Sequence, residues 1–498
     1  MKDPNPARPP SLSSENAERA GRKASVWSGV GLVVALAAGG ALYFRVGRQV
    51  PVRVSEQAPP RGQRSTAEVV EQAPPVQKRF RHWSKEARLA SYSGNGAAMR
   101  FLETAARATH QGHGKEARAA LDEVFRWYPG CPPALLLEVC LALTEGRDAS
   151  ASAALEQLDE KVLVRSPEID LLEALRQRRQ EPGTSPLTRF RDAWTKLGRP
   201  DFRESGLLPG ATPPEIDPKG DLWRWNAWRD VASDDVRRLV VLSMSEPNET
   251  QALFLLQQLP RLESPHDVLA VMDTLRDEVL PESVRATARR TFQEKRVALA
   301  AAHPTSMQLQ LQRVLGNLAP EQPLSAADLA ALERVAALPA WRETSFEEHY
   351  RRTRELLKDV TMPDLPATAW EVASRGLRES GTRLLRERLL GAGRPRSSAQ
   401  RKRLGRVAHA IGEAMARQTT RVERMTGLQL MVDGADAMGD EDARARALAR
   451  LRALDDALLQ FEKTALERWP LSELAEELLA KRLEDEPALI LSFAEEDA

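Results

Sequence analysis

The sequence predicts an all-α protein, in which one N-terminal transmembrane helix precedes a body of helical repeats. Three observations predict this fold class. Residues 24–44 carry no charge, apolar residues elsewhere recur three and four positions apart without alternating β-branched runs, and a 34-residue shift aligns part of the chain with itself. With 498 residues the chain exceeds one compact core, so we expect two or three domains or an elongated array.

The charge balance argues against a nucleic-acid partner held by long-range attraction. The 72 basic and 71 acidic residues nearly cancel, which leaves a formal net charge of +1. Arginine, alanine and leucine are abundant and isoleucine is scarce, as is typical of a GC-rich bacterial genome. Clusters of arginine therefore carry less meaning here than in an average sequence.

The two cysteines, Cys131 and Cys140, exclude a disulfide framework and a four-cysteine zinc site. If they share a helix, their Cα atoms lie about 13 Å apart, whereas a disulfide requires about 7 Å or less. We therefore expect two free thiols.

The first elements are a tail and a membrane anchor. Residues 1–23 are polar and contain several prolines, so we expect them to be disordered. As a helix, residues 24–44 would span about 31 Å, which matches the apolar thickness of a bilayer. Trp27 lies near one end and Tyr43 near the other, as is typical of aromatic residues at membrane interfaces. We predict a transmembrane helix at 24–44.

A cleaved signal peptide is the alternative for this segment. Ala35, Leu36 and Ala37 fit the small-residue cleavage pattern, but the apolar stretch continues past them to Phe44. Its length favours an anchor in the bacterial inner membrane. Basic residues flank both ends equally, so the positive-inside rule does not decide the orientation. The short tail and the following spacer favour a periplasmic body, with a cytoplasmic body as the alternative.

Composition divides the rest of the chain. Residues 45–84 contain the stretch EQAPP twice, which predicts a spacer stiffened by proline. Residues 198–220 contain five prolines and predict a loop or domain boundary. Around this loop we expect a repeat module at 85–197, a helical domain at 221–340 and a C-terminal helical domain at 341–498.

Start and stop signals punctuate the expected helices. The stretches SPHD (264–267) and LSAAD (324–328) place a serine directly before a helix, where its side chain caps the first turn. In DGADAMGDED (433–442) we expect Gly434 to end one helix and Asp440 to cap the next.

The internal repeat lies within residues 97–163. The shift pairs apolar, small and glycine positions, namely Phe101 with Leu135, Ala105 with Val139, Ala108 with Ala142, Gly112 with Gly146, Ala117 with Ala151, Leu121 with Leu155 and Val124 with Leu158. Each unit is predicted to be a helix, a glycine turn and a second helix, and it resembles a tetratricopeptide repeat. Thr104 and Glu138 depart from the leucine that this family prefers, and an unrelated pair of helical hairpins is the alternative. The resemblance implies a helical array with a groove for peptides or helices of other proteins.

No catalytic motif is found. The sequence lacks a P-loop, a dinucleotide fingerprint, a GxSxG turn and an HExxH zinc motif. His110 and His113 lie three residues apart at the first repeat turn, where two solvated histidines are a better interpretation than a metal site. We predict no catalytic residue, no metal and no cofactor.

Three tryptophans, Trp223, Trp225 and Trp228, cluster in DLWRWNAWRD (221–230). They are candidates for an exposed aromatic platform that binds a partner peptide or a glycan. A core anchor at the start of a new domain is the favoured alternative, because large aromatic residues are usually buried.

Residues 375–406 carry the strongest run of positive charge. The candidate anion-binding residues are Arg394, Arg396, Arg401, Lys402, Arg403 and Arg406. They would suit the phosphates of a nucleic acid or an anionic lipid surface. A solvated or internally paired helix face is the favoured alternative, with acidic residues near the C-terminus, such as Glu484 and Asp485, as compensating charges.

Together these features predict a membrane-anchored scaffold or adaptor that presents a protein-interaction surface, by analogy with other repeat folds. We expect protein partners, and membrane contact through residues 24–44. One alternative is a cell-envelope enzyme, which would bring acids or histidines together beside the tryptophans. The other is a cytoplasm-facing binder of nucleic acid or anionic lipid that uses residues 375–406.

Overall fold

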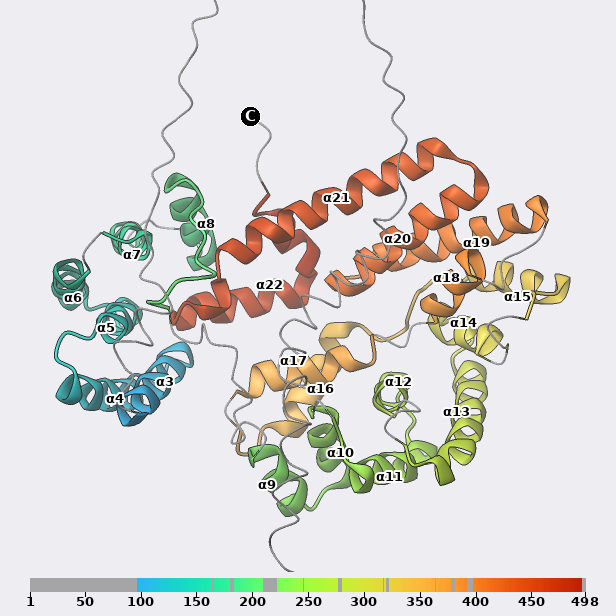
Figure 1. The fold of residues 1–498 in the computed structure, drawn as a ribbon, viewed down its shortest axis with the longest axis horizontal. Helices are drawn as coiled ribbons and strands as arrows, with labels where there is room; N and C mark the ends of the chain where they lie inside the picture. The colour runs from blue at the N-terminus through green and yellow to red at the C-terminus, as the bar shows by residue number, and fades with distance from the viewer. Residues whose placement is uncertain are drawn as a thin grey trace, which may run out of the picture. The chain divides into compact units, whose positions relative to one another are not determined.

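A computed structural model describes residues 96–494, with gaps at 163–164, 180–182, 209–221, 245, 276–279, 317, 319–321, 363, 378–380 and 392–396. Within these ranges the secondary structure is helical, apart from one isolated bridge between Ser306 and Ala340 (Figure 1). The predicted all-α class is therefore confirmed for the described part of the chain.

The predicted tail, transmembrane helix and spacer, at 1–23, 24–44 and 45–84, lie outside the described residues. Among the residues that are described, no helix is both long enough and apolar enough to cross a bilayer.

The first four helices of the described part of the chain form two hairpins. Helix α3 (Gly96–His110) packs against α4 (Gly114–Trp127), and α5 (Pro132–Thr144) packs against α6 (Asp148–Lys161). In α4 the buried residues are spaced three and four apart, as expected of a helix with one apolar face. The hairpins coincide with the two units that the 34-residue shift aligns.

Matching turns join the helices of the two hairpins. Gly112 and Gly146 have φ angles of +74° and +77°, a conformation that glycine adopts without steric cost. In each turn the next residue, His113 or Arg147, donates its backbone N–H to the carbonyl five residues earlier, at 2.8 Å. The 34-residue repeat seen in the residue types is therefore also present in the backbone conformation of the turns.

A third hairpin, α7 (Pro167–Arg178) and α8 (Pro186–Lys196), follows the first two. Helix α5 is buried on all its sides, because nearly every residue from Pro133 to Leu143 is inaccessible to solvent. The chain's own C-terminal helix, α22 (Ser472–Leu491), contacts α3 and α8 (Figure 1). Its buried leucines share one core with α5. An intramolecular helix therefore covers one side of the hairpins.

The segment before α22, which contains the short helix η3 (Leu466–Arg468), fastens it to the hairpins. Arg468 donates hydrogen bonds to four backbone carbonyls within residues 202–208. Trp469 is completely buried, and its ring meets Phe190 and Phe202 edge-on at centroid distances of 5.7 and 5.1 Å. The predicted proline-rich loop is therefore held in place over its described part.

The remaining helices lie on both sides of residue 340, the predicted domain boundary. Those before it are α9 (Leu222–Asp230), α10 (Asp234–Leu242), α11 (Glu249–Gln258), η2 (Leu259–Arg261), α12 (Pro265–Thr274), α13 (Glu282–Ala302), α14 (Met307–Leu315) and α15 (Ala326–Ala336). Those after it are α16 (Phe346–Leu357), α17 (Leu365–Arg375), α18 (Thr382–Leu390), α19 (Ser398–Ala416), α20 (Arg421–Met438) and α21 (Glu441–Lys463). Leu357 of α16 and Val372 of α17 share one hydrophobic core with α9–α14, so this core continues across the boundary.

Helices α19 and α20 approach each other along a row of glycines. A Cβ atom on Gly405 would lie 2.7 Å from the carbonyl oxygen of Gly434, and one on Gly412 would lie 2.6 Å from that of Gly427. The expectation that Gly434 ends a helix is wrong, because this residue permits the close approach within a continuous helix. Helix α20 ends instead at Gly439, whose φ angle is +74°.

The predicted caps are present. Ser264, Ser325 and Asp440 each accept a hydrogen bond from the backbone N–H three residues further along. These contacts start α12, α15 and α21 at the positions that the sequence indicates.

The two cysteines are buried free thiols, as predicted. Burial raises the pKa of the Cys140 thiol within α5. That thiol is therefore poorly suited to act as a nucleophile at neutral pH.

Candidate functional site

A polar cavity lies where the first turns of α12 and α16 meet α10. Its volume is about 490 Å³, within the range of small-molecule sites. We name it the Arg238 cavity. Its lining residues are Asp235, Arg238, Arg261, Leu262, Glu263, Ser264, Pro265, His266, Asp267, His303, Thr344, Glu348, His349 and Arg352. A hollow of about 30 Å³, lined in part by Arg342 and Ser306, shares the two histidines His266 and His349 with it.

Two serine caps place polar groups at this cavity. Ser264 accepts a hydrogen bond from the N–H of Asp267 at 3.4 Å, and Ser345 accepts one from the N–H of Glu348 at 3.1 Å. These caps start α12 and α16, so Asp267 and His349 fall in the first turns of their helices. The positive ends of two helix dipoles therefore meet at the cavity.

An ion pair forms the floor of the cavity. Arg238 is buried, and its guanidinium lies 2.6 Å from the carboxylate of Asp235 and 3.5 Å from that of Asp267. The guanidinium of Arg352 lies 3.9 Å from the same oxygen of Asp267. Burial raises the pKa of Asp267, and the positive charges of the two arginines oppose this rise. Nε of Arg238 is buried without a hydrogen-bond partner among the described residues.

A stacked pair of histidines lies beside this ion pair. The ring centroids of His266 and His349 are 3.4 Å apart, with the planes inclined by 33°. Burial, together with the charge of Arg342, lowers the pKa of His266 from 6.5 to about 3, although a hydrogen bond with the backbone of Ala373 opposes the shift. Burial likewise lowers the pKa of His349, helped by the repulsion of His266 and nearby arginines. Both rings are therefore neutral at pH 7, which permits their close contact.

The stacked histidines should make the fold sensitive to acid. Below pH 6.5 the two histidines bind protons in the unfolded chain but stay neutral in the folded chain, because folding lowers their pKa values. Stability is therefore lost as the pH falls from about 6.5 toward 3, by up to about 1.4 kcal/mol per pH unit for each histidine. In denaturant titrations between pH 7 and 5, His349→Phe should lose less stability than the unmodified chain.

The matched control for this measurement is His113→Phe. His113 is exposed at a turn, so this change should leave the pH dependence as it is. If His349→Phe and the unmodified chain lose stability in parallel, the buried histidine does not resist protonation as we expect.

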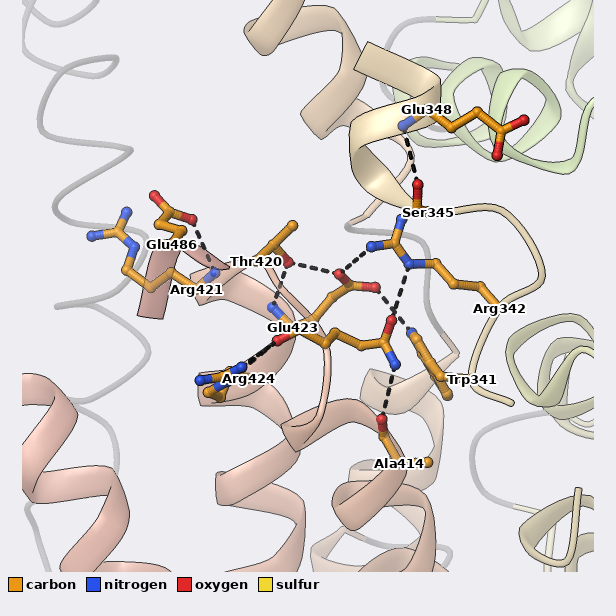
Figure 2. Close-up of polar contacts among 11 residues, drawn as sticks. Trp341, Arg342, Ser345, Glu348, Ala414, Thr420, Arg421, Glu423, Arg424 and Glu486 are labelled. Carbon is orange, nitrogen blue, oxygen red and sulfur yellow. Dashed lines mark hydrogen bonds and ion pairs between the residues drawn. The ribbon is translucent and has the colours of Figure 1, made fainter. Parts of the chain in front are cut away.

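A buried polar network supports the cavity wall that leads into α16. Figure 2 shows Glu423 at its centre, where the carboxylate accepts hydrogen bonds from three side chains. Trp341 donates Nε1–H at 3.1 Å, Arg342 donates a guanidinium N–H at 3.0 Å and Thr420 donates its hydroxyl at 2.7 Å. The network therefore connects the segment before α16 with the first turn of α20, and it positions the charge that acts on His266.

The same region is also tied to the C-terminal helix. The carboxylate of Glu486 accepts the backbone N–H of Arg421 at 2.9 Å (Figure 2), and the guanidinium of Arg424 lies 3.0 Å from the carboxylate of Asp485. Asp485 interrupts the helical geometry of α22. These contacts link α20 with the helix that covers the hairpins.

The arrangement suits the binding of a small polar molecule. It combines buried charges of both signs with two neutral imidazoles. Asp267, with its raised pKa, and the two histidines are residue types that also act in general acid–base catalysis. Across the described ranges, no three His, Cys, Asp or Glu residues are arranged to hold a metal ion.

The three tryptophans named from the sequence lie outside this cavity. Trp223 and Trp228 are partly buried and pack against the core, and Trp228 meets Phe254 edge-on at 5.0 Å. Trp225, between them on α9, is 46% exposed. Two tryptophans of the cluster, Trp223 and Trp228, therefore pack against the core, whereas Trp225 faces the solvent.

The basic run is compensated in part by acidic side chains where it is described. Arg401 lies 3.1 Å from Asp436, and Arg403 forms a two-bond pair with Glu333 at 2.8 Å. Lys402 and Arg406 are exposed on the same helix. Arg394 and Arg396 lie outside the described residues. The compensating acids come from α15 and α20, whereas Glu484 and Asp485 pair with Lys481 and Arg424.

The two histidines of the first repeat turn have different surroundings. His113 is exposed, while Nδ1 of His110 lies 3.4 Å from the carbonyl oxygen of Trp469. That contact joins the turn to the C-terminal segment.

The sequence pattern does not indicate a site among the residues of the Arg238 cavity. The stretch that contains His266 and Asp267 predicts only the start of a helix. That interpretation is correct, but a cap pattern does not indicate which way the next side chains face. Arg238, Asp267 and Arg352 come from three helices, so no local spacing could have joined them.

No family model matches the chain, and comparison with the curated proteins and with the solved structures gives no match either.

Proposed function

We propose that this protein is a membrane-anchored helical scaffold whose body presents an interaction surface to another protein. In this proposal residues 24–44 are the anchor, and the tetratricopeptide-like hairpins α3–α6 begin the helical array. The matching turns at Gly112 and Gly146 support the comparison with repeat proteins.

The partner surface that we propose is not the side of the hairpins that α22 covers. Helix α22 contacts α3 and α8, and its buried leucines share one core with α5. Contacts such as Glu477 with the backbone N–H of Leu187, at 2.8 Å, add polar bonds to this packing. A partner therefore has to use another face of the body.

Trp225 is the single observation that carries the proposed surface. It is half-exposed, although its neighbours Trp223 and Trp228 anchor the same helix in the core. An exposed tryptophan offers a large apolar contact at a low cost in conformational entropy, because its side chain has only two rotatable bonds, and tryptophan is common at binding hot spots. The chemistry of this surface fits a protein partner with an apolar pocket.

One experiment tests the anchor and the surface together. Bacterial cells produce the full chain with a reporter fused after Ala498 that is active only outside the cytoplasm, and with benzoylphenylalanine in place of Trp225. We expect reporter activity, and a discrete cross-linked product on illumination. The photoreactive residue in place of Leu459, which is exposed to a similar degree, should give no such product.

The reporter and the cross-link test separate parts of the proposal, and each can contradict its part. An inactive but stably produced reporter would place the body in the cytoplasm. The absence of a product at position 225, or the same product at both positions, would remove the proposed surface.

An envelope enzyme is the second candidate function, because the Arg238 cavity brings a histidine pair and a carboxyl of raised pKa together. The enzyme hypothesis drawn from the sequence expects acids or histidines beside the three tryptophans. None of these tryptophans lines the Arg238 cavity. A binder of nucleic acid or anionic lipid has less support, because acidic side chains already pair with Arg401 and Arg403.

A further inference from the structure

Charges of both signs surround the Arg238 cavity in nearly equal number. The arginines are Arg238, Arg261 and Arg352, and the carboxylates are those of Asp235, Glu263, Asp267 and Glu348. A purely anionic ligand would lie beside the carboxylates, and a purely cationic ligand would lie beside the arginines. In either case the attraction of the oppositely charged residues would not offset the cost of removing the ligand's charge from water. The lining therefore favours a ligand that carries both charges.

The ion pair at the floor leaves bonding capacity unused. Charge-assisted hydrogen bonds are about 2.7–2.9 Å long. Asp267 is further than this from both of its arginines, at 3.5 Å from Arg238 and 3.9 Å from Arg352. Nε of the buried Arg238 has no partner at all among the described residues. Asp267 also has a hydrogen bond with the side chain of Ser264. A closer cationic donor for Asp267 and an acceptor for the arginines would add the missing charge-assisted bonds.

We propose that the Arg238 cavity binds a small zwitterion of the α-amino acid type. Its ammonium group would bond to Asp267, and its carboxylate would lie between Arg238 and Arg352. In an α-amino acid the ammonium and carboxylate groups are attached to one carbon. This short separation matches the site, where the carboxylate of Asp267 lies directly beside the guanidinium groups of Arg238 and Arg352. The volume of about 490 Å³ leaves space for a side chain beyond them.

The surrounding helices favour the same orientation. Helices α12 and α16 both begin at the cavity, and the positive ends of their dipoles stabilise a bound carboxylate. The stacked rings of His266 and His349 form a neutral wall, so they do not compete with the ammonium group for Asp267 as cations would. The network around Glu423 holds the segment that leads into α16, so the site is formed before a ligand arrives.

Isothermal titration of the full-length chain in detergent tests this proposal, with each of the twenty common L-amino acids as a separate probe. We expect at least one of them to bind saturably at millimolar concentration or below. The methyl ester of that amino acid lacks the carboxylate and its N-acetyl form lacks the ammonium, so each should bind roughly tenfold more weakly or worse. If no amino acid binds, or if either derivative binds equally well, the proposal is overturned.

Three variants locate the binding on the chain. Asp267→Asn keeps the shape of the side chain but removes the charge, and it should weaken binding by roughly ten- to a hundredfold. Arg352→Gln alters an arginine that is 59% exposed, so the fold should tolerate it, and the affinity should fall roughly tenfold. The matched control, Arg351→Gln, alters an adjacent arginine that is 73% exposed and pairs with Glu347, and it should bind as the unmodified chain does.

Thermal unfolding of each variant separates a lost site from a lost fold. Equal affinity in the two cavity variants and the unmodified chain would place the amino acid elsewhere and would sink the proposal. An equal loss in Arg351→Gln would do the same, because the effect would then be one of general surface charge.

Discussion

Replacing Glu423 with alanine is expected to lower the free energy of unfolding by about 3–5 kcal/mol. The carboxylate is buried and accepts hydrogen bonds from Trp341, Arg342 and Thr420. Its removal leaves the guanidinium of Arg342 buried without its counter-charge, and leaves two further donors without an acceptor. Urea denaturation of the full-length chain, followed by circular dichroism, measures this change.

A second pair supplies the control for that measurement. Glu333 and Arg403 form an ion pair of similar length between α15 and α19, but both side chains are more than a third exposed. Glu333→Ala should therefore change the stability little, since water screens the pair and replaces its bonds. If the two alanine variants have the same stability, burial does not set the strength of the Glu423 network.

The second large effect is expected from Trp469→Ala, which should cost about 3–5 kcal/mol. The indole is completely buried between Phe190 and Phe202, and its Nε1–H donates to the carbonyl of Thr464 at 3.0 Å. Alanine would leave a cavity in the core that joins the C-terminal segment to the hairpins. The same urea titration measures the loss, and limited proteolysis should show earlier cleavage near residues 464–493.

Trp225→Ala is the matched control, because it removes the same side chain from a half-exposed position. Its effect on stability should be within about 1 kcal/mol. A Trp469→Ala variant as stable and as protease-resistant as this control would mean that the C-terminal segment is not held to the hairpins by its buried tryptophan.

Local features of the fold could be predicted from the sequence with good accuracy. The all-α class, the turns at Gly112 and Gly146, the serine caps and the free thiols all follow from interactions within a few residues. The failure at Gly434 is informative, because glycine has two uses. It can end a helix by adopting positive φ, or it can allow another backbone to approach, and one sequence does not distinguish them.

The candidate site could not be predicted in the same way. The sequence drew attention to Trp225 and its neighbours and to the basic run, where like residues lie close together in the chain. In the Arg238 cavity the relevant groups are single residues on α10, α12 and α16, each unremarkable among its neighbours. Their significance arises only from burial and from proximity in space.

The residues along the chain dictate the local backbone: where helices start, where glycine turns recur, and which faces are apolar. The partner of each apolar face, and the distant charges that come together, follow from the folded arrangement alone. Helix α5 is apolar all round, so its burial could be expected, but not that α22 from the other end of the chain would cover it. The physical reason is that backbone geometry depends on neighbouring residues, whereas the hydrophobic effect has no direction and accepts any surface of fitting shape.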